Sequence, residues 1–270
     1  MRWAILRMLT SLQNGRVKLV RQLQQQGDSR ESEGLFVAEG LRLADDFLRA
    51  GMRASFALLS EQSIAQKWRE EHREVECVTV TDTIMRSVSQ ETTPPGVLVV
   101  FNLPRFDVAT LAQSLPDQVL ILDTLRDPGN LGACLRVAAG SDCRLVLLSP
   151  GCVDPYNPKV VRGGMGAHAR IQVVRVSWDD IRQLCAGRPI WAADANGKHT
   201  YDAVAWTAPN ALIIGSEAAG LSAEALAQAT AIVTIPLSNH LESLNAAVAC
   251  GVILFEAARQ RREKSPMSTA

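Results

Sequence analysis

Six short apolar runs in the C-terminal half of the chain limit most strongly what it can fold into. Each run is continuously apolar rather than alternating, turn residues bound it, and helix-like segments separate most of the runs. Continuous apolar strands are typical of a parallel sheet that helices cover on both faces. We therefore predict a doubly wound α/β domain. The six predicted strands span residues 118–123, 144–149, 170–176, 189–194, 211–216 and 231–236.

The first hundred residues predict a smaller α/β domain. Apolar runs alternate there with helical patterns, and Gly51 is placed to end the second helix. The following segment carries Pro104 and Pro116, as expected of a linker. The predicted strands span 34–40, 54–60, 75–80 and 96–101, and the helices 17–26 and 41–51. The predicted organisation is a first domain over 1–101, a linker over 102–117, a second domain over 118–262 and a flexible tail over 263–270.

The composition excludes several classes of protein. Hydrophobic residues make up 47% and charged residues 21% of the chain, so it can bury a core and is not a disordered tail. No apolar stretch reaches the roughly 18–20 residues of a membrane span. Six scattered cysteines without a C-x-x-C pair, and four histidines without H-E-x-x-H spacing, predict no metal and no disulfides, but free thiols in a reducing cytoplasm.

The charges cancel overall but are unevenly distributed. Lys and Arg number 28, as do Asp and Glu, which argues against a protein whose whole surface attracts phosphate. The first 27 residues nevertheless hold five basic residues and no acid. A solvated helix face explains such a start equally well. A transit peptide is another alternative, but serine is scarce there and no cleavable apolar core follows.

The loops at the carboxyl ends of the strands are where ligand chemistry is expected in an open parallel sheet. The first such loop follows the strand that ends at Asp123, turns through Pro-Gly-Asn and enters a helix. Helical side chains lean toward the N-terminus, so Arg136 is expected to lie over Gly132 and reach toward Asn130. The alternative is an ordinary strand–turn–helix junction with a surface arginine.

A second loop, residues 212–222, holds a carboxylate between two glycines. Gly215 and Gly220 allow close backbone approach on either side of Glu217, and Ser222 can cap the next helix. Taken alone, this pattern also fits an ordinary glycine-bearing loop.

The third segment, residues 235–260, predicts a helix that is apolar on all sides and must therefore be buried on all sides. Ser243 and Asn245 stand at the head of this helix, beside free backbone N–H groups. Helix capping explains Ser243 but leaves Asn245 without a role, so a ligand or a polar partner is expected there.

Several common signatures are missing. No G-x-G-x-x-G follows the first strand of the second domain, and neither G-x-x-x-x-G-K-[ST] nor G-x-S-x-G occurs. These absences disfavour a standard dinucleotide fold, a P-loop NTPase and an α/β-hydrolase.

Taken together, the three loops resemble the three motifs of the SpoU/TrmH family of RNA ribose 2′-O-methyltransferases. The matching patterns are D-P-G-N-L-G-x-x-x-R at 127–136, G-S-E-x-x-G-L-S at 215–222 and I-P-L…E-S-L-N at 235–245, in the family's order. Residues 11–40 are similar to the family's L30e-like substrate-binding domain. The resemblance spans Ser11 to about Arg259.

The resemblance implies that the second domain is an α/β trefoil knot that binds S-adenosylmethionine and forms homodimers with sites near the subunit interface. The residues expected to hold the cofactor are Gly215, Gly220, Ile235, Leu237 and Leu244. The residues expected to shape the catalytic site are Asn130, Arg136, Glu217, Ser243 and Asn245. Two departures are Leu237, where the family commonly has Met, and 238–240, where a glycine is frequent.

The resemblance assigns activation of the ribose 2′-hydroxyl to Arg136. An arginine has a pKa of about 12.5, and lowering it by ~5 units to make a free base would cost roughly 7 kcal/mol. A fixed cation that stabilises a developing alkoxide needs far less, since single donors contribute about 3–4 kcal/mol in such sites. We therefore favour electrostatic activation over proton abstraction.

The expected function is methyl transfer from S-adenosylmethionine to a ribose 2′-hydroxyl of structured RNA. Ribosomal RNA is the first choice because the L30e-like domain is typical of rRNA-modifying members. A tRNA methyltransferase and a catalytically inactive RNA-binding or ribosome-assembly protein are the alternatives. A Rossmann-like enzyme using another nucleotide lacks its glycine fingerprint. The residues expected to contact phosphates are Arg16, Lys18, Arg21 and Arg30, for which an exposed helix face is the alternative.

Overall fold

The computed structural model describes residues 8–239 and 241–264, and these form two compact units. The first unit comprises the chain up to Pro104 together with residues 156–169. The second comprises residues 105–155 and the chain from Arg170 onward. In the part of the chain so described, no helix combines the length and the apolar character needed to cross a membrane.

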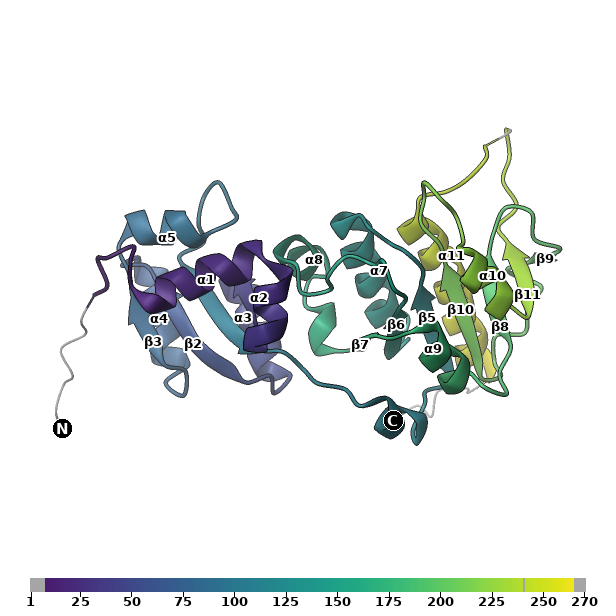
Figure 1. The fold of residues 1–270 in the computed structure, drawn as a ribbon, viewed down its shortest axis with the longest axis horizontal. Coiled ribbons are helices and arrows are strands. Elements are labelled where there is room, and N and C mark those ends of the chain that lie inside the picture. The colour runs from purple at the N-terminus through teal and green to yellow at the C-terminus, as the bar shows by residue number, and fades with distance from the viewer. Residues whose placement is uncertain (1–7, 240, 265–270) are drawn as a thin grey trace. The chain divides into compact units, whose positions relative to one another are not determined.

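The first unit is built on a four-stranded mixed sheet (Figure 1). The central strand β4 pairs antiparallel with both β1 and β2, and β3 pairs parallel with β2. In sheet order the strands are β1 (Leu35–Glu39), β4 (Val97–Asn102), β2 (Ala54–Leu59) and β3 (Cys77–Thr79). The helices are α1 (Gly15–Gln25), α2 (Gly27–Glu33), α3 (Leu41–Arg49), α4 (Ser63–Glu71), α5 (Asp82–Val88) and α8 (Pro158–Gly163).

Both faces of this sheet are covered, because alternate residues of each strand enter different cores. In β1, Phe36 belongs to one buried cluster and Val37 to the other. The first cluster is aromatic, and Tyr156 joins it with its ring centroid 4.9 Å from that of Phe36. Residues 156–169, predicted as part of the second domain, therefore complete the core of the first unit.

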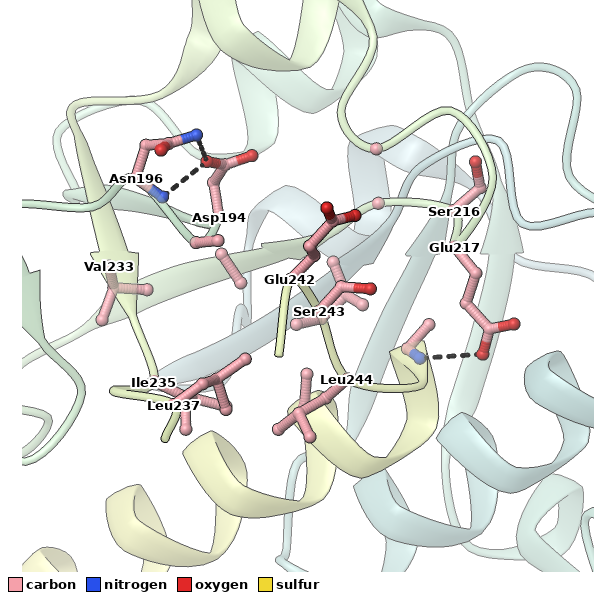
Figure 2. A pocket seen from close by; sticks show the side chains of 17 residues that line it. Asp194, Asn196, Ser216, Glu217, Val233, Ile235, Leu237, Glu242, Ser243 and Leu244 are labelled. Atoms are coloured by element: carbon pink, nitrogen blue, oxygen red, sulfur yellow. Dashed lines mark hydrogen bonds between the residues drawn. The ribbon is translucent and has the colours of Figure 1, made fainter. Parts of the chain in front are cut away.

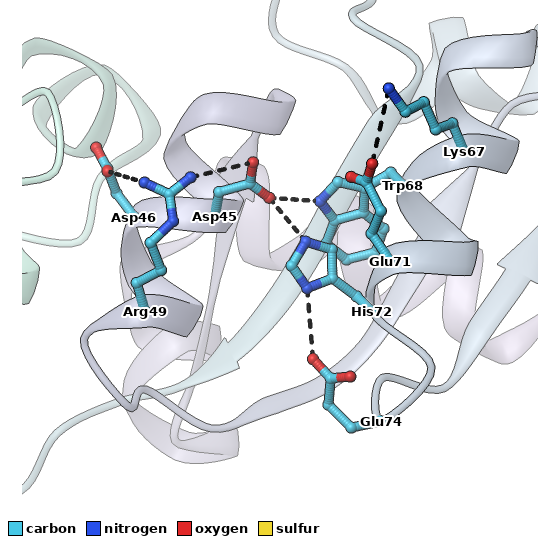
Figure 3. A network of polar contacts seen from close by, with 8 residues as sticks. All are labelled: Asp45, Asp46, Arg49, Lys67, Trp68, Glu71, His72 and Glu74. Atoms are coloured by element: carbon cyan, nitrogen blue, oxygen red, sulfur yellow. Dashed lines mark hydrogen bonds and ion pairs between the residues drawn. The ribbon is translucent and has the colours of Figure 1, made fainter.

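A polar network ties α3 to α4 in the first unit (Figure 3). The Trp68 indole N–H donates to Asp45 Oδ1 at 2.7 Å, and His72 Nε2 lies 3.0 Å from the same oxygen. Since Trp68 is only 2% exposed, Asp45 supplies the acceptor that its buried N–H requires. This network stabilises the first unit.

The second unit is a seven-stranded sheet in which every pairing is parallel, which confirms the predicted α/β fold. In sheet order the strands are β7 (Gln172–Arg175), β6 (Leu145–Leu148), β5 (Gln118–Leu122), β10 (Asn210–Ile214), β8 (Ile190–Ala193), β11 (Ala231–Thr234) and β9 (His199–Thr200). The helices are α6 (Val108–Ala112), α7 (Pro128–Gly140), α9 (Trp178–Leu184), α10 (Ala223–Gln228) and α11 (Ala246–Lys264). The two-residue strand β9 is too short to show an apolar run, and the sequence did not predict it.

The ends of the predicted second domain differ in detail. The predicted linker contains α6, whose Leu111 is buried in the core of the second unit. Helix α11 continues to Lys264, so residues 263 and 264 are helical rather than part of a tail. The rest of the predicted tail, residues 265–270, and residues 1–7 of the possible targeting segment 1–10 lie outside the described residues.

Candidate active site

A cavity of about 370 Å³ opens at the carboxyl ends of β8, β10 and β11, where the parallel sheet predicts a ligand site (Figure 2). Its walls come from four segments, 193–196, 214–220, 233–237 and 242–249. All five residues predicted to hold the cofactor line this one cavity, and so do two of the predicted catalytic residues, Glu217 and Ser243.

The loop after β10 is a tight turn that needs both of its glycines, for different reasons. The backbone N–H of Ser216 donates to the Gly220 carbonyl at 3.0 Å, and the Gly220 N–H donates back to the Ser216 carbonyl at 2.8 Å. A Cβ atom at Gly215 would lie 2.4 Å from the Gly220 carbonyl oxygen. Gly220 itself has a φ of +67°, which favours glycine.

The start of α7 places Asn130 through an ordinary capping arrangement. Asp127 precedes the helix, and its Oδ1 accepts the Asn130 backbone N–H at 2.8 Å. Pro128 occupies the first helical turn, where its missing N–H does no harm. The D-P-G-N sequence therefore fixes the position of Asn130 in the first turn of α7.

Asn245 joins the three motifs in one hydrogen-bonded chain. Its side-chain amide donates to Asn130 Oδ1 at 2.9 Å and also to Glu217 Oε1. Its Oδ1 accepts the backbone N–H groups of Ala247 at 3.0 Å and Val248 at 3.2 Å, so Asn245 caps α11. The expectation that Ser243 would cap this helix is wrong, and the partner expected for Asn245 is found.

Glu217 also supports the head of α11. Its Oε1 accepts the Ala246 backbone N–H at 3.1 Å, in addition to the amide of Asn245. A carboxylate at a helix N-terminus is stabilised by the free N–H groups and by the helix dipole. The loop after β10 is thereby fastened to the last helix.

Arg136 lies elsewhere. It is exposed on α7, does not line the cavity, and forms no hydrogen bond or ion pair within the described part of the chain. Six residues of α-helix separate it from Asn130, which turns the two side chains about 120° apart around the axis. Gly132 is buried. The expected approach of Arg136 over Gly132 toward Asn130 is therefore not found within one chain.

Four polar residues of the cavity were not predicted from the sequence, namely Asp194, Asn196, Ser216 and Glu242. Asp194 and Asn196 follow β8, and Asp194 Oδ1 accepts the Asn196 backbone N–H at 2.9 Å. Glu242 lines the cavity from the third motif. Asp194 ends a predicted strand, so the rule that selected the other loops could have found it. With Glu217 these residues make three carboxylates, and no Lys, Arg or His among residues 8–239 and 241–264 lines the cavity.

Three buried or half-buried cysteine thiols have raised pKa values. Burial raises the pKa of the Cys143 thiol to about 12 and that of Cys185 to about 11, and it also raises the pKa of Cys152. A nucleophile would need a lowered thiol pKa. All six cysteines are free, and no group of three or more His, Cys, Asp or Glu in residues 8–239 and 241–264 could hold a metal ion.

The predicted phosphate contacts of the first unit have different surroundings. Lys18 is exposed and has no partner among the described residues. Arg16 pairs with Glu76 at 2.6 Å, and Arg21 donates to the Ser87 hydroxyl. Arg30 is only 3% exposed and donates to a backbone carbonyl at the end of α1. A buried guanidinium cannot reach an external phosphate, so the prediction for Arg30 is wrong.

Comparisons with known proteins agree with the motifs. Residues 117–255 match the family model of the SpoU rRNA Methylase family, and residues 14–99 match that of the MRM3-like substrate binding domain. The chain belongs to the SpoU rRNA methylase family. The mitochondrial rRNA methyltransferase 3 of Mus musculus is 32% identical over 293 residues, which cover 87% of this chain and 70% of that protein. The 23S rRNA (guanosine(2553)-2'-O)-methyltransferase RlmP of Bacillus subtilis is 27% identical over 93% of this chain and 98% of its own.

A solved structure supports the fold and the cofactor. The AdoMet-bound rRNA methyltransferase from Sinorhizobium meliloti superposes with a TM-score of 0.84 at 29% identity, covering 94% of this chain and 97% of that one. The family uses S-adenosylmethionine. The cavity fits such a group, because its lining combines the apolar side chains of Ile235, Leu237 and Leu244 with carboxylates that favour a cation.

Proposed function

We propose that this protein transfers a methyl group from S-adenosylmethionine to a ribose 2′-hydroxyl of ribosomal RNA. The observation that carries the proposal is the chain Asn130–Asn245–Glu217, which brings three distant motifs together beside the cavity. Ribosomal RNA is named as the substrate of both curated relatives. We place the cofactor domain in the second unit, with boundaries near 118 and 262, and RNA binding in the first.

The residues of the cavity bind and orient the reactants. When bound, S-adenosylmethionine would supply a methyl group on a sulfonium for transfer to the ribose oxygen. The backbone near Gly215, Ile235 and Leu244 would hold the cofactor, and Glu217 and Asn245 keep the wall of the cavity in place. The pre-organised arrangement spares the reaction much of the entropy of bringing two reactants together.

We also propose that two copies of the chain pair through α7 and α11. Helix α11 was expected to be buried on all sides, but Val248 is 51% exposed and Phe255 is 47% exposed. The Phe255 ring lies against α7, 3.4 Å from the position of a Cβ at Gly140. Exposed apolar side chains on a packed helix pair are a feature of protein interfaces. A homodimer would cover them.

The dimer gives Arg136 a place in the reaction. Arg136 is exposed on α7 and does not line the cavity of its own chain. We propose that it acts at the cavity of the second copy, where its fixed positive charge stabilises the developing ribose alkoxide. We also propose that the second unit is a trefoil knot, in which α11 packs against α7. A cytoplasmic location is a separate proposal, which rests on the free thiols of the chain.

Mixed dimers test the placement of Arg136. One partner carries Arg136→Ala, and the other carries Gly215→Ala, which removes the cofactor site. If Arg136 acts across the interface, the mixed dimer has one intact site and about half the activity of a wild-type dimer. If Arg136 acts within its own chain, both sites of the mixed dimer are dead, and this part of the proposal fails.

Mapping of ribose methylation across total RNA tests the function. RNA from cells with and without the protein should differ at one 2′-O-methyl position in ribosomal RNA, and the wild-type gene should restore it. A lost position in tRNA would favour the tRNA alternative. Failure of the purified protein to bind S-adenosylmethionine in calorimetry would favour the inactive RNA-binding alternative.

A further inference from the structure

A buried carboxylate contacts the loop of residues 215–222, which follows β10 and is called the cofactor loop below. Asp123 directly follows β5 and is fully buried at 0% exposure. Its Oδ2 accepts the backbone N–H of Ser222 at 2.7 Å, and its Oδ1 accepts the Ser149 hydroxyl at 2.9 Å. Among the described residues Asp123 forms no ion pair, so these hydrogen bonds alone compensate the burial of its charge.

The hydrogen bonds of Asp123 connect the carboxyl ends of three neighbouring strands, β6, β5 and β10. Ser222 closes the cofactor loop that follows β10, and Ser149 follows β6. The Thr124 backbone N–H donates to the Ser149 oxygen at 3.1 Å, and Asp123 Oδ1 at 2.9 Å is a nearer acceptor for the Ser149 hydroxyl than the Pro150 carbonyl at 3.3 Å. The backbone N–H of Asp123 donates to the Ile214 carbonyl at 2.9 Å, at the other end of the cofactor loop. Asp123 therefore holds both ends of this loop.

We propose that Asp123 is a positioning residue for the cofactor site. It does not line the cavity, but it fixes the end of the loop whose other residues do. The inference rests on the proposed function, because it assigns the cavity to S-adenosylmethionine. Its physical content is that the two accepted hydrogen bonds, rather than the negative charge, keep the loop in the geometry that binds the cofactor.

A pair of substitutions separates hydrogen bonding from charge. Asp123→Ala leaves the Ser222 N–H buried without an acceptor, and S-adenosylmethionine should bind about tenfold more weakly in calorimetry. Asp123→Asn can accept from Ser222 through its oxygen and donate to Ser149 through its amide, so its Kd should stay within about threefold of wild type. In RNA methylation by Asp123→Ala, KM for the cofactor should rise while kcat at saturating cofactor stays within about twofold.

Asp107→Ala is the matched control in the same unit. Asp107 also accepts a backbone N–H, from Thr110 at 2.9 Å, but it caps α6 and does not line the cavity. Its substitution should leave the Kd unchanged. Wild-type binding of S-adenosylmethionine without RNA is measured first, since its absence refutes the proposed function rather than this inference.

Two results would overturn the positioning role. One is an unchanged Kd in Asp123→Ala. The other is an equal loss in Asp123→Asn and Asp123→Ala, which would assign the effect to charge. Should Asp123→Ala lack a cooperative unfolding transition, Ser149→Ala decides instead. Loss of that hydroxyl frees one carboxylate oxygen and should raise the Kd about threefold, and an unchanged Kd refutes the inference.

Discussion

Replacing Gly215 with alanine should destroy the cofactor site through a clash with backbone atoms. The new Cβ would lie 2.4 Å from the Gly220 carbonyl oxygen, 2.6 Å from its carbon and 2.9 Å from the Leu221 nitrogen. Carbon–oxygen contacts in proteins settle at about 3.3–3.6 Å, so the two sides of the turn must separate by about 1 Å. No side chain can yield to relieve this clash, because all three neighbouring atoms belong to the backbone.

The cost follows from the hydrogen bonds that such a separation breaks. Ser216 and Gly220 exchange two backbone hydrogen bonds, of 3.0 and 2.8 Å. Each contributes about 1 kcal/mol net, and residual crowding adds about 1 kcal/mol more. A loss of about 3 kcal/mol in the binding-competent loop corresponds to a Kd for S-adenosylmethionine raised roughly 150-fold.

Gly220→Ala and Gly15→Ala make the comparison sharp. An alanine at Gly220 meets nothing within 4 Å but must adopt a φ of +67°, which costs about 1–2 kcal/mol. The expected weakening is about 5- to 30-fold. Gly15 has open space and no positive φ, so its substitution should leave binding unchanged. Calorimetry with each variant checks the order. Equal Kd values for Gly215→Ala and wild type, in folded protein, would refute the steric reasoning.

Three further predictions concern stability. The hydrogen bond from Arg259 holds the pKa of Glu256 down to about 2 from its usual 4.5, so the stability it contributes is complete above about pH 4.5 and is lost as the pH falls toward 2. In denaturant unfolding, the unfolding free energy of Glu256→Gln should be lower than that of wild type at pH 6, and this difference should become smaller at pH 3. A difference that stays the same at both pH values contradicts this. Asp45→Ala strips the buried Trp68 indole of its acceptor and should lower the unfolding free energy by about 1–3 kcal/mol, whereas Asp45→Asn, which keeps an acceptor, should cost less; equal losses argue against the indole contact. Asn245→Ala removes a helix cap and should cost about 1–2 kcal/mol in thermal or denaturant unfolding, with no comparable loss in Ser243→Ala.

Much of the second unit could be predicted because most of its strands lie in short, mainly apolar runs. Such runs show that both faces are buried, and they give the strands and the edge at which polar loops gather. Figure 2 shows three predicted residues around one cavity, Glu217 from the loop after β10 and Ser243 and Leu244 from the segment before α11. The motifs supplied the chemistry, which periodicity alone could not.

Other features depend on tertiary contacts that leave no local pattern. Residues 156–169 join the aromatic core of the first unit through Tyr156, although they lie between two strands of the second. Arg30 lies among Asp28, Glu31 and Glu33 in the sequence and looks like an ordinary surface residue, yet its guanidinium is buried. Asn245 and Ser243 are both good helix caps, and only the position of the first helical turn, at Ala246, selects Asn245.

The negative charge of the cavity predicts that it binds S-adenosylmethionine more tightly than S-adenosylhomocysteine. Asp194, Glu217 and Glu242 line the cavity, and the part of the chain that the structure describes adds no basic side chain to them. S-adenosylmethionine carries a sulfonium that S-adenosylhomocysteine lacks. One carboxylate in the same cavity contributes roughly 1 kcal/mol to the binding of that charge, or about fivefold in Kd. Asp194→Asn keeps the oxygen that accepts from Asn196 and should therefore reduce the preference for the sulfonium about fivefold, while Glu224→Gln, on α10 outside the cavity, should not. Calorimetry with both compounds decides the matter, since equal weakening of both would mean that Asp194 only shapes its loop.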